Sequence, residues 1–156
     1  MEYFSTNSVK RFFAQYVQNE VNLKGYYFGQ PFDINGQTTV EQLYPGMLVT
    51  PINSQALQYT INRTYQITIY DILNFEKSNE IEIISDCEEY AFRLIRYITA
   101  NHDYFSIVGV PTISPFVDKF LDDVAGVIID IVIEFNGESN ECLDTMPNFT
   151  PPSINV

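Results

Sequence analysis

The sequence has little of what catalytic sites are built from: one histidine, two cysteines and no tryptophan in 156 residues. A Ser-His-Asp or Cys-His site would need His102, which we interpret instead as a polar cap at the end of a predicted helix. No glycine-rich phosphate loop, nucleophile elbow or CxxC pair is present. We therefore expect no enzymatic activity, no bound metal and no cofactor.

The two cysteines, Cys87 and Cys142, are interpreted as small packed side chains rather than as a disulfide or a redox pair. No apolar run reaches the ~20 residues of a membrane span. The first residues also lack the basic and then apolar pattern of a signal peptide. We expect assembly in a reducing cytoplasm and no membrane partner.

Basic residues are scarce: 8 Lys and Arg stand against 20 Asp and Glu, for a formal net charge of −12. A surface this acidic repels a phosphate backbone, so specific binding of nucleic acid is disfavoured. Hydrophobic residues make up 46% of the chain, which is enough for one globular core. The 11 Tyr and 12 Phe suit either that core or a protein interface.

Hydrophobic periodicity predicts an α+β fold in the order α-β-β-α-β-β, with two helices packed on a four-stranded, mainly antiparallel sheet. We expect one domain over residues 1–142 and an extended, proline-containing tail over 143–156. An aromatic-rich connector is predicted over 25–42. The predicted helices span 8–21 and 79–100, and the predicted strands span 47–52, 59–73, 104–110 and 127–135.

Three segments are predicted to offer side chains to a neighbouring subunit. The aromatic connector should pack on its own domain or on a partner, and the run between Pro45 and Pro51 predicts a short edge strand. A loop from Pro111 to Gly126 carries further aromatic rings and a pair of aspartates. The candidate interface residues are Tyr26, Tyr27, Phe28, Phe32, Met47, Phe116, Phe120, Leu121, Asp122 and Asp123.

Acidic side chains form two clusters, one around Asp86 and Glu89 and one around the Asp122-Asp123 pair. Neither has the spacing of a calcium loop, so a solvated acidic face is the favoured interpretation. In an extended segment the paired aspartates point to opposite sides. One of them then faces the interior or a partner. Salt bridges to Arg93, Arg96 or Lys119 are an open alternative.

Three segments resemble the neck and tail-completion proteins of tailed bacteriophages: Leu43-Tyr44-Pro45-Gly46-Met47, Ile84-Ser85-Asp86-Cys87 and PFVDKFLDDVAG at 115–126. Together they cover roughly 43–142. The likeness is to tail-terminator-like ring proteins, and especially to the portal-proximal ring proteins of crAss-like podophages.

The resemblance implies a structural subunit of the virion neck or tail region, forming a ring that joins portal to tail. Its implied partners are further copies of itself, the portal, adaptor or other neck ring proteins, and tail proteins. DNA would pass through an axial channel without specific binding, and Asp86 and Glu89 are candidate channel-facing residues. Two alternatives stay open: a cytoplasmic adaptor that binds a protein through its aromatic loop, and a metal-dependent enzyme using the acidic clusters.

Overall fold

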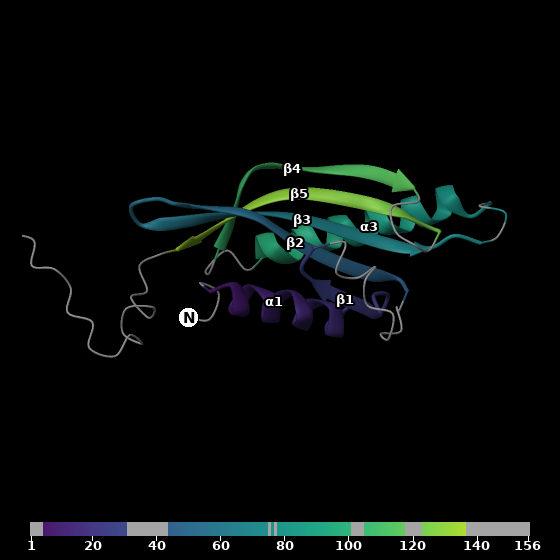
Figure 1. Ribbon diagram of the computed structural model, residues 1–156, viewed down its shortest axis with the longest axis horizontal. Helices are drawn as coiled ribbons and strands as arrows, with labels where there is room; N and C mark the ends of the chain where they lie inside the picture. The colour runs from purple at the N-terminus through teal and green to yellow at the C-terminus, as the bar shows by residue number, and fades with distance from the viewer. Residues whose placement is uncertain are drawn as a thin grey trace, which may run out of the picture.

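A five-stranded sheet with two helices on one face forms the centre of the computed structural model (Figure 1), which describes residues 5–30, 44–74, 76, 78–100, 105–117 and 123–136. The chain therefore belongs to the α+β class, as predicted. Its elements are α1 (Thr6–Asn19), β1 (Gly25–Phe28), β2 (Gly46–Ala56), β3 (Thr60–Ile72), α3 (Glu80–Ala100), β4 (Phe105–Val117) and β5 (Val124–Asn136).

The sheet is mixed, with strand order β1-β2-β3-β5-β4. β1 runs parallel to β2, whereas the other three pairs are antiparallel. The expectation of four strands was wrong because residues 25–28, read as irregular connector, form β1. A strand of 4 residues with no alternation of polar and apolar side chains has too weak a local pattern to be recognised in the sequence. Pairing with β2 is what holds these residues in a strand.

Both helices follow their amphipathic pattern. α1 begins at the Ser5 cap, whose side-chain oxygen accepts a hydrogen bond from the Ser8 N–H at 3.1 Å. The predicted span of 8–21 was therefore two residues late at each end. α3 lies within one residue of its predicted span, and its buried stripe faces the sheet. That stripe consists of Ile83, Cys87, Ala91, Leu94 and Ile98.

β4 runs through Pro111 and Pro115, so the expectation that Pro111 ends the strand was wrong. An edge strand tolerates proline because its missing N–H faces no partner. Gly109, at φ +71°, lies inside a register shift where Val108 pairs with Val132 but Thr112 pairs with Asp130. Pro111 lies within this bulge, and β4 pairs with β5 again from Thr112 onward.

The main core lies between the helices and one face of the sheet, and aromatic rings fill much of it. Phe12 of α1 packs against Tyr97 of α3 and Phe105 of β4, with ring centroids 5.4 Å and 4.9 Å apart. On the opposite face, Leu48, Tyr70 and Val124 form a smaller buried cluster. Gly126 brings β3 and β5 together there: an added Cβ would lie 1.9 Å from the Ile69 carbonyl oxygen.

Candidate interaction surface

Charge is distributed unequally between the two layers. α3 carries Glu80, Glu82, Asp86, Glu88 and Glu89 but only Arg93 and Arg96, which leaves the helix with a formal charge of −3. β2 and β4 carry no charged residue at all. Because the whole chain carries −12, these strands are the parts of the described surface where another acidic molecule meets least repulsion.

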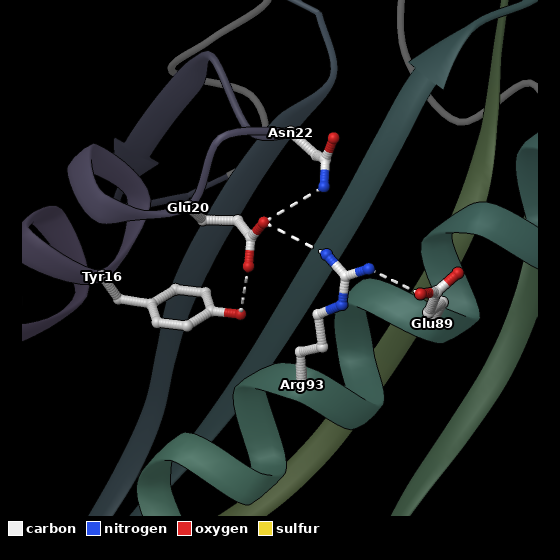
Figure 2. Close-up of polar contacts among 5 residues, drawn as sticks. All are labelled: Tyr16, Glu20, Asn22, Glu89 and Arg93. Atoms are coloured by element: carbon white, nitrogen blue, oxygen red, sulfur yellow. Dashed lines mark hydrogen bonds and ion pairs between the residues drawn. The ribbon is translucent and has the colours of Figure 1, made fainter.

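A group of polar side chains joins α1 to α3 at the charged side of the molecule (Figure 2). Arg93 Nη1 lies 3.3 Å from Glu20 Oε1, and Arg93 Nη2 lies 2.5 Å from Glu89 Oε1. Asn22 Nδ2 donates to the same Glu20 oxygen at 3.2 Å, and the Tyr16 hydroxyl donates to Glu20 Oε2 at 3.5 Å. Glu20 is only 13% exposed, so the arginine compensates a carboxylate that has little water around it.

This group is built for cohesion between helices. Burial, followed by the neighbouring Glu20 carboxylate, raises the pKa of Tyr16 well above its ordinary value, so the phenol stays a neutral donor. The hydrogen bond to Glu89 raises the pKa of Arg93 further. Arg93 is thus engaged by Glu20 and Glu89. Arg93 was one of three basic residues considered as a salt-bridge partner for the paired aspartates, and the structure shows it in contact with Glu20 and Glu89 instead.

Met47 was predicted to lie at a subunit interface, and its position contradicts that prediction. Its side chain is 0% exposed and belongs to the main core, because β1 covers the outer side of β2 up to Val49. Tyr26 and Phe28 of β1 are half-buried and pack against the same core. The Tyr26 hydroxyl donates to the Lys10 carbonyl oxygen of α1 at 2.8 Å.

The other predicted interface residues are more open. Tyr27 and Phe116 are half-buried beside the small cluster on the second face, and Asp123 is exposed. The Asp123 carbonyl oxygen accepts a hydrogen bond from the Leu73 N–H at 2.8 Å, which joins the start of β5 to the end of β3. Several predicted positions lie outside the described residues, namely Phe32, Phe120, Leu121, Asp122, His102 and Cys142.

Asp86 and Glu89 are both exposed on α3, as a solvated acidic face requires. Cys87 beside them is buried and free, which confirms its interpretation as a packed side chain. Burial, with the nearby Asp71 and Asp86 carboxylates, raises the pKa of Cys87 to about 12. The thiol therefore stays protonated and unreactive at neutral pH.

Sequence reasoning expected an edge strand between Pro45 and Pro51, where β1 covers β2 up to Val49, and it missed the two edges that are free. β1 pairs with β2 only as far as Val49, and β4 is the outermost strand on the other side. Of ten large hydrophobic residues exposed in the described part of the chain, four lie on β2 and β4 and two lie in the turn between β2 and β3. They are Ile52, Leu57, Tyr59, Val108, Val110 and Val117.

The absence of charged residues from β2 and β4 was the one feature of the sequence that could have indicated these edges. It does not show that either strand lies at an edge of the sheet until the strand order is known.

Sites for small ligands are not evident in the described residues. One apolar crevice, lined by Val9, Phe12, Phe13, Phe105, Ile133 and Phe135, is too narrow to admit water. Within the same described ranges, no three His, Cys, Asp or Glu side chains are grouped to hold a metal ion. Neither α1 nor α3 is long and apolar enough to cross a membrane.

Comparison with known proteins adds no relative. No protein-family model matches the chain, and no curated protein is significantly similar to it. The surface itself must therefore carry the argument about function.

Proposed function

We propose that this protein is a structural subunit of a tailed bacteriophage, forming a ring in the head-to-tail connector through which DNA passes. The observation that carries the proposal is the pair of uncharged sheet edges on a chain whose net charge is −12. A closed ring needs two different complementary surfaces on each subunit. Two open edges on opposite sides of one sheet supply such a pair.

The resemblance of residues 43–47, 84–87 and 115–126 to tail-terminator-like ring proteins supports the same proposal. Two of the three segments meet at one end of the sheet, where Gly46 and Phe116 flank the cluster of Leu48, Tyr70 and Val124. In Gly46, an added Cβ would lie 2.7 Å from the Tyr70 ring. The described parts of these two segments therefore pack around one cluster.

The acidic face of α3 supports passage of DNA. Asp86 and Glu89 are exposed on that face, and a channel lined by carboxylates repels phosphates instead of holding them. Partners in this proposal are further copies of the chain, the portal or another neck ring, and tail proteins. The proposed location is the neck or tail region of the virion, and the proposed role is not enzymatic.

Co-expression with the portal protein of the same phage tests the proposal. Light scattering and negative-stain imaging should show rings, either of this chain alone or stacked on the portal. A chain that stays monomeric and joins neither a portal nor a tail complex contradicts it. A stable monomer that captures a peptide through residues 25–32 would favour the adaptor alternative.

Deleting the aromatic connector would not be a clean test of the adaptor alternative. Deleting residues 25–28 would remove β1 and the Tyr26 contact with α1, so lost binding would not distinguish recognition from misfolding. Substituting Tyr27, which lies on the second face, leaves that contact in place.

A further inference from the structure

The outer edge of β4 is a long strand side with no charge and no partner among the described residues. Pro115 pairs in register with Val127, and a proline inside a sheet places its nitrogen on the free side. Ile113 and Val117 lie two residues to either side, so their N–H and C=O groups face outward as well. The free side of residues 112–117 thus presents the N–H and C=O groups of Ile113 and Val117, and only the C=O group of Pro115.

A second free edge lies on the opposite side of the sheet, in the outer half of β2. A bulge between Pro51 and Asn53 follows the end of β1 pairing, and residues 53–56 then run in register with β3. Every residue from 52 to 59 is exposed. In Figure 1 this β2–β3 hairpin projects past the neighbouring strands at one end of the sheet.

Electrostatics makes these edges the described surface where a second copy of the chain meets least repulsion. Two molecules of charge −12 repel at most orientations, and α3 alone contributes −3 to each. Between Gly46 and Tyr70 the only charged residue is Arg63, whose Nη1 donates to Thr6 Oγ1 of α1 at 2.9 Å. Hairpin and β4 can therefore meet without bringing like charges together.

The prolines and bulges on both edges limit what can pair there. Pro51, Pro111 and the Gly109 bulge interrupt the ladders, which guards against indiscriminate edge-to-edge aggregation. They leave two short runs, 53–56 and 112–117, and in the second run Pro115 supplies an acceptor but no donor. Short runs on opposite edges favour a heterologous contact that repeats from copy to copy.

We propose that residues 53–56 of one copy pair with residues 112–117 of the next copy, so that the sheet continues from subunit to subunit. This inference rests on the proposed ring and names the surface that closes it. Ile52, Leu57 and Tyr59 of the hairpin then lose water against Val108, Val110 and Val117 of the neighbour.

Placing a charge on the free edge tests the inference with a closely matched control. Ile52 is 53% exposed on β2, and Phe92 is 54% exposed on α3. Ile52→Lys and Phe92→Lys each change the net charge by +1, from −12 to −11, so both weaken general repulsion equally. We expect Ile52→Lys to raise the subunit dissociation constant at least about tenfold, and Phe92→Lys to leave it within about twofold.

Light scattering over a concentration series measures this effect, with circular dichroism to verify folding. Equal losses of association in the two variants, or a loss only with Phe92→Lys, would overturn the inference.

Cross-linking identifies the paired edges directly. Gln55 pairs with Asn62 and Ser114 pairs with Ile128, which places both side chains on the face opposite the helices, whereas Ser54 lies on the helix face. In a Cys142→Ser background, mixed Gln55→Cys and Ser114→Cys chains should give dimers with a short bismaleimide. Either variant alone should give few, and Ser54→Cys mixed with Ser114→Cys should give fewer than the same-face pair.

The outcomes separate this inference from the proposed function. Rings without mixed dimers overturn the edge pairing and leave the ring proposal standing. Cross-links from Ser114→Cys to the portal protein in place of a second copy also overturn the pairing. A chain that stays monomeric with and without the portal overturns both.

Discussion

The sheet edges and the exposed face of α3 differ in their content of charged side chains. β2 and β4 have no ionisable side chain and expose Ile52 and Val110, whereas α3 has seven charged residues in 21. Charges on the helix meet partners inside the molecule, as Arg93 does with Glu20 and Glu89. The comparison teaches that the two surfaces differ in charge: α3 exposes Ile81 and Phe92 among acidic side chains, whereas the edge strands expose apolar side chains with no charge on the same strand.

The centre of the sheet should tolerate an added side chain far less well than its edge does. Substitutions of two glycines, Gly126 at the centre and Gly109 at the edge, measure the difference. Gly126→Ala places a Cβ 1.9 Å from the Ile69 carbonyl oxygen, so β3 and β5 must separate. We expect a loss of at least about 3 kcal/mol in the free energy of unfolding, measured by urea denaturation.

The edge glycine provides the control. A Cβ on Gly109 meets no atom within 4 Å, and only its φ of +71° opposes the substitution. Gly109→Ala should cost about 1 kcal/mol. Equal losses at the two positions would show that centre and edge do not differ.

The buried tyrosines of the sheet should make the protein sensitive to alkali. Burial raises the pKa of Tyr65 to about 12, although the nearby Arg63 partly opposes this. An acid whose pKa is raised by folding stabilises the native state below the unfolded pKa of ~10 and loses that contribution as pH rises through the folded pKa. Stability should therefore fall between about pH 10 and pH 12, by at most about 3 kcal/mol from this group.

Tyr65→Phe should reduce that alkaline loss and change little at pH 7. Its hydroxyl is buried, and although Arg63 is near enough to lower its pKa, no described group meets hydrogen-bond geometry with it. Removing the hydroxyl should therefore leave stability equal or up to about 1 kcal/mol higher. Denaturation midpoints at pH 7, 10 and 11.5 measure both effects. A large loss at neutral pH would mean that the hydroxyl has a stabilising partner.

Asp71, at the end of β3, should have a smaller effect in the acidic range. Burial, followed by Asp86, raises its pKa above 3.8, so the native state binds the proton more tightly than the unfolded chain. Its contribution is complete below pH 3.8 and is lost as pH rises through the folded pKa. Asp71→Asn keeps an oxygen that can accept the Ile72 N–H and should be slightly more stable than the natural chain at pH 7.

Thermal unfolding from pH 3.5 to 7 tests that expectation. A variant whose melting temperature falls at neutral pH relative to the natural chain contradicts it.

Substitutions at the exposed ion pair of α3 should change the stability of the protein least. Glu89→Gln removes one partner of Arg93, but Glu89 is 60% exposed and Glu20 still contacts the guanidinium. We expect a slight decrease in melting temperature that vanishes in 0.5 M salt, because exposed ion pairs are weak and screened. Glu20→Gln, at the less exposed carboxylate, should cost more, and the reverse order would contradict this account.

Local pattern predicted the elements whose burial repeats along the chain. The stripe of Ile83, Leu94 and Ile98 predicted α3, and the alternation of β3 predicted that strand. β2 was predicted to end at residue 52, but it runs to Ala56. The end of β4 was missed because proline ends a central strand but not an edge strand. Met47 was assigned to the surface because nothing in residues 45–51 shows that β1 will cover it.

By itself, the sequence determined the net charge, the lack of ionisable groups on β2 and β4, and the apolar faces of both helices. These properties depend on composition and on spacing within one segment. Only the tertiary structure decided that β4 and the outer half of β2 are free edges, and that Glu20 meets Arg93 across 73 positions of sequence. Strand order and ion pairing depend on contacts between distant segments, and a local pattern has no information about which segments will meet.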